Sequence, residues 1–464
     1  MERLPLQIAI ISLVLSFSHL LLCASDDRIT PGASISSNGT LVSNGGAFAL
    51  GFFLSGNSNS DLYLGVWYNN IPQKTVVWVA NREKPITDSS AVLRISEDGN
   101  LIVMDSKGGI YWSSNLTGLG TPGNNTVAVL LNTGNLVLRE DINILWQSFD
   151  HPTDTFLPGM KIQYIYSNHS TTQFTSWKDA NDPSPGNFSI GIDANTVLQL
   201  LTWTGSKKYW RSQVWSGILF SGIRGPNSNS VIYITYLANE GGISTIFGVS
   251  DPSYYIRYTL NYSGQVQVSS WDYSSKSWQY YASAPINCER YGWCGQFAYC
   301  DATASVSTCK CLEGFEPKVD SDWSAGNFSG GCIRKKALQC GNGDGFLRVQ
   351  GMKLPDHFVF LRNKNISECR SECMGNCSCI AYSYSDLTML NSTGNGTISR
   401  CLVWLEELID TELLRSGGED LYLRLMDLNL GMFLSFLLPQ CKIVSSYSSH
   451  MNQVEQVHSG YCRS

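Results

Sequence analysis

Cysteine is missing from a long stretch of this 464-residue chain. The chain has 15 cysteines, but none falls between Cys23 and Cys288, whereas twelve lie between Cys288 and Cys401. About 260 residues must therefore be held together by ordinary apolar cores. The segment that follows has the cysteine density of small domains that need disulfides. The sequence thus predicts two kinds of architecture joined in one chain.

Charge and catalytic motifs are also scarce. Only 15% of the residues are charged and the net charge is -6, which argues against a nucleic-acid partner. No kinase phrase (Val-Ala-Ile-Lys, His-Arg-Asp or Asp-Phe-Gly) and no Gly-x-Ser-x-Gly elbow occurs. Ser148, Asp150, His151 and Asp154 lie close in sequence, but neighbouring side chains of an extended segment alternate faces and do not converge. We therefore predict no catalytic residue and no enzymatic activity.

Long apolar runs are limited to the first residues. The run Ile8–Cys23 follows Met1–Arg3 and ends at Ala24, which is typical of a secretory signal peptide over residues 1–24. A signal anchor is the alternative, although the run is short for a membrane span. The segment Leu428–Leu438 is apolar but interrupted, and it is far shorter than the roughly 20 residues that a span needs. We expect a secreted, extracellular protein.

N-glycosylation sequons are numerous, and behind a signal peptide they predict surface glycosylation. The expected sites are Asn38, Asn115, Asn124, Asn168, Asn187, Asn261, Asn327, Asn365, Asn391 and Asn395. The eleventh sequon, at Asn376, is a doubtful site because its middle residue is Cys377.

An internal repeat of about 35 residues runs through the cysteine-free part. Residues 91–104 recur as residues 128–138, and each copy is followed by a strand with a tryptophan, Trp112 or Trp146. A looser copy over residues 40–68 contains Trp67. Each copy reads as strand, Gly-containing turn, strand and aromatic strand. Three such sheets would bring their tryptophans to a shared axis, as in repeat architectures that bury a common core.

These phrases resemble a known family. Residues 77–83 (VWVANRE), 146–160 (WQSFDHPTDTFLPGM) and 177–186 are similar to S-locus glycoproteins and to the ectodomains of G-type lectin (S-domain) receptor-like kinases. Tyr209–Ser212 (YWRS) continues the pattern. The resemblance implies a bulb-type lectin domain over residues 25–150, which is a three-sheet β-prism. It also implies a second lectin-like domain over residues 151–283.

The mannose motif of that lectin fold, Gln-x-Asp-x-Asn-x-Val-x-Tyr, is incomplete here. Asp98 and Asn100 are the candidate sugar ligands, but the Gln and the Tyr are absent from both copies. A polar site without half of its partners loses the hydrogen bonds that select its ligand. We therefore expect Asp98 and Asn100 to be turn residues. The motif positions are Ser96, Asp98, Asn100, Ile102 and Met104, and then Leu131, Thr133, Asn135, Val137 and Arg139.

Six cysteines over residues 284–332 resemble an EGF-like module. Sequence alone leaves their pairing open. The resemblance implies Cys288–Cys300, Cys294–Cys309 and Cys311–Cys332. No acidic cluster precedes the first cysteine and no histidine lies among the six, so we predict neither calcium nor zinc, and no other metal.

Residues 340–425 resemble a PAN/apple module, which implies the pairs Cys369–Cys401 and Cys373–Cys379. The partners of Cys340 and Cys377 stay open. Ser367 is expected to cap a helix that runs through residues 368–374 and places Cys369 and Cys373 on one face. The tail over residues 426–464, with Cys441 and Cys462, departs from the family pattern.

The predicted fold is mainly β: two tandem bulb-lectin-like β-prism domains, a disulfide-rich EGF-like module and an α+β PAN/apple module. The resemblance implies recognition of a small cysteine-rich protein or peptide, of the pollen self-incompatibility type or in related cell-surface sensing. It also implies that the secreted protein acts in the apoplast or cell wall. An S-domain receptor kinase and a second copy, in a homo- or heterodimer, are further implied partners, and no cofactor is expected. Two alternatives stay open: a truncated product of a receptor-like serine/threonine kinase, placed at the plasma membrane in a longer form, and a secreted lectin for mannose-type glycans.

Overall fold

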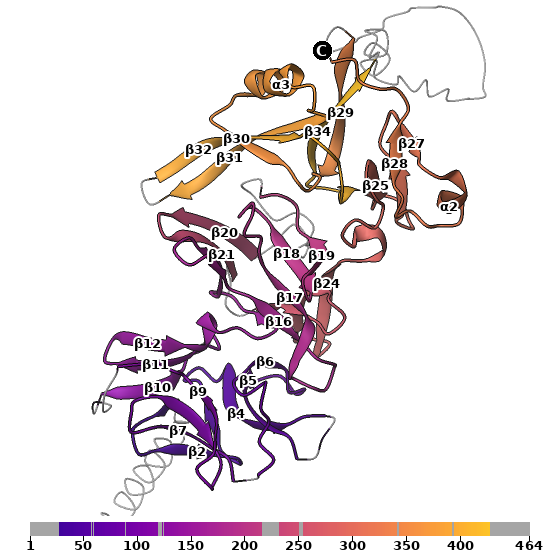
Figure 1. Ribbon diagram of the computed structural model, residues 1–464. Helices are drawn as coiled ribbons and strands as arrows, with labels where there is room; N and C mark the ends of the chain where they lie inside the picture. The colour runs from indigo at the N-terminus through magenta and orange to yellow at the C-terminus, as the bar shows by residue number, and fades with distance from the viewer. Residues whose placement is uncertain are drawn as a thin grey trace, which may run out of the picture.

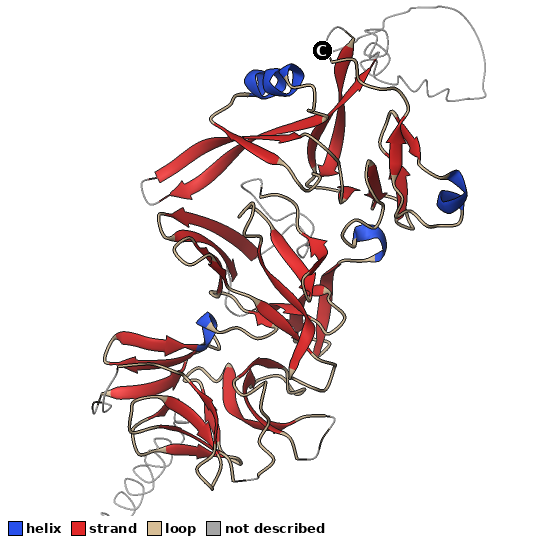
Figure 2. Cartoon of the chain, viewed as in Figure 1, coloured by secondary structure: helices blue, strands red, loops and turns tan. Residues whose placement is uncertain are grey.

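The computed structural model describes residues 27–56, 58, 60–88, 90–118, 123, 125–215, 232–249, 254–340, 343–391 and 394–426. The expected signal peptide, Asn124, and the tail from residue 427 with Cys441 and Cys462 lie outside these residues. The described chain runs from a β-structure at one end through a second in the middle to a mixed module at the other end (Figure 1). Nearly all regular structure is strand, with short helices (Figure 2). Within the described ranges, no helix is both long and apolar enough to cross a membrane.

The first β-prism consists of three antiparallel sheets of four strands each. Each sheet contains three strands that are consecutive in the chain. One short strand from the beginning of the domain pairs with them at the edge of the sheet. The sheets are β3 (Thr40–Val42), β4 (Phe48–Leu54), β5 (Leu62–Tyr68) and β6 (Val76–Val79); β2 (Ser34–Ser36), β7 (Val92–Ile95), β8 (Leu101–Met104) and β9 (Ile110–Ser113); and β1 (Arg28–Ile29), β10 (Thr126–Leu130), β11 (Leu136–Glu140) and β12 (Asn143–Gln147).

Three tryptophans meet at the centre of this prism. Trp78, Trp112 and Trp146 lie on the last strand of each sheet, with ring centroids 5.3 to 5.9 Å apart in edge-to-face arrangements. The predicted shared axis is present, but the prediction of Trp67 as its third member is wrong. Side chains alternate along β5, so Leu64 and Val66 enter the core and Trp67 lies on the opposite face.

The second β-prism repeats this plan with three more four-stranded sheets. A 3-10 turn, η1 (Ser148–Asp150), links the two prisms. The sheets are β13 (Thr155–Phe156), β22 (Ile256–Leu260), β23 (Val266–Asp272) and β24 (Ser277–Ala284); β14 (Lys161–Ile165), β15 (Ser170–Thr171), β20 (Ile232–Asn239) and β21 (Gly242–Val249); and β16 (Phe174–Trp177), β17 (Pro185–Ile192), β18 (Leu200–Thr204) and β19 (Lys207–Arg211).

The EGF-like and PAN parts share one eight-stranded sheet. Parallel pairing of β25 with β33 joins the two parts, so the sheet crosses the expected module boundary. The strands of this sheet are β25 (Ala298–Asp301), β26 (Thr308–Cys311), β29 (Asp344–Lys353), β30 (Val359–Arg362), β31 (Ala381–Asn391), β32 (Gly394–Trp404), β33 (Thr411–Leu413) and β34 (Glu419–Met426). Outside it lie η2 (Asn287–Glu289), β27 (Phe315–Pro317), α2 (Asp320–Ser324), β28 (Cys332–Arg334) and α3 (Ile366–Gly375).

Six disulfides staple this C-terminal region. They include the five pairs that the resemblance implies, together with Cys340–Cys377. Cys369 and Cys373 are fully buried on the inner face of α3, where Cys369 is tied to β32. Cys369, Cys373, Cys379 and Cys401 belong to a small buried cluster with Phe346, Tyr382 and Val403, so these cross-links are part of the core of the region.

The N-cap of α3 is Asn365, so the prediction of Ser367 is wrong. Asn365 Oδ1 accepts a hydrogen bond from the Glu368 N–H at 2.9 Å, and Glu368 Oε2 accepts one from the Asn365 N–H at 2.8 Å. This reciprocal capping box satisfies two N–H groups that the first turn would leave unpaired. Ser367 lies inside the helix, which begins at Ile366.

Candidate functional site

The turn between β7 and β8 holds the two candidate sugar ligands. Asn100 is buried, and its Oδ1 accepts hydrogen bonds from Ser114 Oγ at 2.8 Å and from the Leu116 N–H at 2.7 Å. Its Nδ2 donates to the Leu116 carbonyl at 3.1 Å and to Asp98 Oδ2 at 3.2 Å. Both ends of the amide are therefore used inside the protein. Asn100 fastens the loop after β9 to this turn.

Asp98 is exposed at the tip of the same turn. Ser96 Oγ donates to Asp98 Oδ1, and the Asn100 N–H is 3.4 Å from that oxygen. The hydrogen bonds from Ser96 and then from Asn100 lower the pKa of the Asp98 carboxyl below its ordinary value. Ile102, at the position of the sugar-packing valine, is buried. Asp98 thus has solvent access, but the partners that a mannose would need beside it are already engaged.

The second copy repeats this arrangement at Asn135. The Asn135 Nδ2 donates to Gln147 Oε1 at 2.9 Å, and its Oδ1 accepts from Ser148 Oγ at 3.1 Å and from the Phe149 N–H at 3.2 Å. Asn135 is buried like Asn100. In both copies, the Oδ1 of this asparagine therefore accepts a serine hydroxyl and a backbone N–H from the segment after the last strand of its sheet.

The Ser148 to Asp154 segment is structural in the described chain. Ser148 Oγ donates a hydrogen bond to Asn135 Oδ1, and the His151 ring stacks on the Trp146 ring with their centroids 5.4 Å apart. Asp154 is buried and accepts a hydrogen bond from the Thr153 hydroxyl. Burial raises the pKa of Asp154, while the charges of nearby arginines oppose that shift. The side chains do not converge on one point.

Arg82 joins the two prisms. Its guanidinium donates to four backbone carbonyls of the second prism, those of Pro183 at 2.6 Å, Thr175 at 2.9 Å, Ser176 at 2.6 Å and Ser184 at 3.5 Å. Arg82 is buried, and this burial lowers its pKa. A groove of about 430 Å³ lies next to this clamp and a larger one of about 850 Å³ lies between β4 of the first prism and Trp177 of the second.

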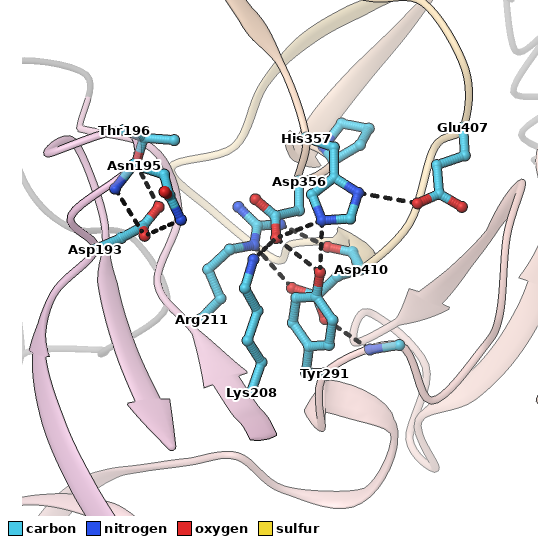
Figure 3. Close-up of polar contacts among 12 residues, drawn as sticks. Asp193, Asn195, Thr196, Lys208, Arg211, Tyr291, Asp356, His357, Glu407 and Asp410 are labelled. Carbon is cyan, nitrogen blue, oxygen red and sulfur yellow. Dashed lines mark hydrogen bonds and ion pairs between the residues drawn. The ribbon is translucent and has the colours of Figure 1, made fainter. Parts of the chain in front are cut away.

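A polar junction connects the second prism to the PAN part (Figure 3). Arg211 at the end of β19 is fully buried and pairs with Asp410 at 3.0 Å, while Lys353 reaches the same carboxylate at 3.1 Å. Arg211 also donates to the carbonyl of Leu354 at 2.7 Å. A buried charge needs such pairing, so these contacts fix how the two parts meet.

Asp356 lies at the rim of the same junction. It accepts hydrogen bonds from Lys208 at 2.6 Å and from the Tyr291 hydroxyl at 2.7 Å. Burial raises the pKa of Asp356, but the charge of Arg211 and these two hydrogen bonds outweigh burial and hold the pKa well below its usual range. His357 is half-exposed, and its Nδ1 is 2.9 Å from Glu407 Oε1.

The sequence motifs quoted above contained Arg82 and Arg211, but sequence reasoning gave neither a role. Their partners lie about 100 and 200 residues away in the chain, so no local pattern identifies them. A lone arginine inside a strand-rich, apolar phrase is the signal that could have marked both as buried and paired.

The sequon asparagines lie mostly on the surface. Asn261 is half-buried, and the side chains of Asn391 and Asn395, on β31 and β32, are outside the described ones. The exposed ones are Asn38, Asn115, Asn168, Asn187, Asn327, Asn365 and Asn376.

Comparison with known proteins identifies the family of this chain. The model of the D-mannose binding lectin domain matches residues 75–178, that of the S-locus glycoprotein domain residues 210–319, and that of the PAN-like domain residues 340–411. An S-locus-specific glycoprotein of Brassica oleracea is 37% identical over 405 residues, which cover 85% of this chain and 90% of that protein. The chain belongs to the S-locus glycoprotein family. The predicted resemblance and the mainly β fold class are thereby confirmed.

The chain is also similar to receptor-like serine/threonine-protein kinases. A receptor-like serine/threonine-protein kinase of Arabidopsis thaliana is 37% identical over 421 residues, covering 89% of this chain and 48% of the kinase. The chain thus spans about half the length of such relatives. The mannose-specific agglutinin of snowdrop (Galanthus nivalis) is 24% identical over 25% of this chain and 93% of its own, with a TM-score of 0.20. None of the three matched domains is a kinase domain.

Proposed function

We propose that this S-locus glycoprotein family member is a secreted recognition protein whose ligand is a protein or peptide rather than mannose. The observation that carries the proposal is the engagement of Asn100 and Asn135 in internal hydrogen bonds. A sugar hydroxyl that displaced those bonds would leave buried polar groups unpaired, at about 1–3 kcal/mol each. The loss of Gln and Tyr from both motif copies points the same way.

Family membership supports recognition as the general role. The expected partners are a small cysteine-rich protein or peptide, an S-domain receptor kinase and a second copy of the chain. Expected export and the sequons favour an extracellular place of action. A receptor-kinase product is the second candidate, because the chain matches about half the length of kinase relatives.

Mannan affinity chromatography tests the ligand class. The secreted protein, deglycosylated with an endoglycosidase, is passed over immobilised mannan and washed with free mannose. We expect it to pass straight through. Retention that free mannose reverses would overturn the proposal in favour of a lectin.

An Asp98→Ala variant is the matched control for that column. Asp98 is exposed, so its removal leaves the buried Asn100 contacts largely intact. If the parent protein is retained and the variant is not, mannose binds at this turn. Passage of both proteins agrees with the proposal.

A further inference from the structure

The groove of about 850 Å³ between the two prisms is lined by both apolar and polar side chains. The apolar ones include Phe53, Leu54 and Trp177, and Leu54 is 53% exposed. The polar ones include Lys74 and Asp88. Such a lining matches a carbohydrate, because a pyranose ring packs its C–H face on apolar groups by dispersion and offers hydroxyls to polar ones.

One end of this groove is closed by direct contact between the two prisms. Ser55 Oγ donates to the Asn181 carbonyl at 2.8 Å, and the Gly56 N–H donates to the same oxygen at 3.1 Å. The groove is therefore part of a fixed junction, which Arg82 holds from within. An occupant would contact both prisms at once.

Asn38 is itself part of the groove wall. It is exposed in the turn between β2 and β3, and Asn38-Gly39-Thr40 is a sequon. Because the acceptor asparagine lies in the wall, an N-linked glycan on it would be attached at the groove itself, and its first sugars would lie next to the groove lining.

We propose that the glycan on Asn38 folds back into this groove and bridges the first and second β-prisms. The glycan thus packs on the protein and stabilises the junction between the prisms, instead of extending into solvent. The proposal rests on the proposed export of the chain but not on the identity of its recognition ligand.

The sequon at Asn365 provides the contrast. It lies beside a groove of about 580 Å³ along α3, whose other walls include Lys364, Glu368 and Glu372. No aromatic or aliphatic side chain is part of that wall. A glycan on Asn365 therefore has no apolar surface to pack on and is expected to extend into solvent.

The test compares glycan release at these two sites. The full chain is secreted from a eukaryotic host, and glycopeptide mass spectrometry first measures occupancy. The native protein is then treated with peptide-N-glycosidase, and release at Asn38 and Asn365 is followed over time. We expect release at Asn38 to be about ten times slower in the native protein and equal to that at Asn365 after denaturation.

A Leu54→Asp variant and a Thr40→Ala variant sharpen the result. Leu54 is half-exposed on the groove wall, so its replacement should accelerate release at Asn38 alone. Thr40→Ala removes the sequon, and faster hydrogen exchange is then expected at residues 52–54 and 177–181. An unoccupied Asn38, or equal native release rates at both sites, would overturn the proposal. Neither result bears on mannan binding, so failure here is distinct from failure of the proposed function.

Discussion

At the scale of single residues, a buried asparagine after the Gly turn organises two of the three sheets of the first prism. Asn100 and Asn135 each accept a backbone N–H and a serine hydroxyl from the segment that follows the tryptophan strand. This use of the amide explains why Asn at this position is compatible with a prism that lacks the rest of the mannose motif. The residue type alone does not reveal whether it faces a ligand or the protein.

Replacement of Asn100 by Ala should destabilise the protein by about 2 kcal/mol, because the Leu116 N–H and the Ser114 hydroxyl lose a buried acceptor. Asp98→Ala, at the exposed tip, should change the free energy of unfolding much less than Asn100→Ala does. Urea unfolding followed by tryptophan fluorescence measures both. Equal losses in the two variants would contradict the assigned role of Asn100.

At the scale of elements, the sequence predicts the hairpins of the prisms more directly than it predicts how the sheets pack against one another. Alternating apolar residues and Gly turns predict β7–β8 and β10–β11. The tryptophan of the first sheet was placed on the wrong strand, because β5 and β6 are both aromatic and apolar. Only the packing of the three sheets shows that Trp78 faces the axis.

Capping of α3 can be tested with three variants that all remove the Asn365 sequon and therefore share one glycan state. Asn365→Ala should destabilise the helix by about 1 kcal/mol, since the Glu368 N–H loses its acceptor. Asn365→Asp keeps an acceptor, and Ser367→Ala leaves the cap intact. Hydrogen exchange of the amides at residues 366–370 should be about five times faster in Asn365→Ala alone. Faster exchange in Ser367→Ala instead would restore the sequence-based cap.

At the scale of the whole molecule, the junction between the second prism and the PAN part should loosen in acid. The pKa of Asp356 is depressed in the folded protein, so its contribution to stability is complete above its ordinary pKa near 4. Below this value the carboxylate is protonated in the opened state but stays ionised in the folded one, so its contribution to stability shrinks as the pH falls. The contribution is lost completely only when the pH passes through the depressed pKa of the folded protein, where Lys208, Arg211 and Tyr291 lose their partner's charge.

Hydrogen exchange, corrected for the intrinsic effect of pH, measures this loosening. Protection of residues 289–292 and 353–357 should fall between pH 5 and about pH 3 in the parent protein. In an Asp356→Asn variant, which carries no titrating group at this position, protection should be lower at pH 5 and should change less with pH. Unchanged protection in the parent protein down to pH 3 would exclude Asp356 as the source of acid sensitivity.

The sequence by itself determined the β class, the repeat, the division at Cys288 and the family, because strand periodicity, Gly turns and cysteine spacing are local patterns. Tertiary structure alone decided which tryptophan reaches the axis, that Asn365 caps α3, and that Arg82 and Arg211 hold the modules together. It also joined the EGF-like and PAN parts in one sheet. These features depend on contacts between residues far apart in the chain, whose partners no local pattern specifies.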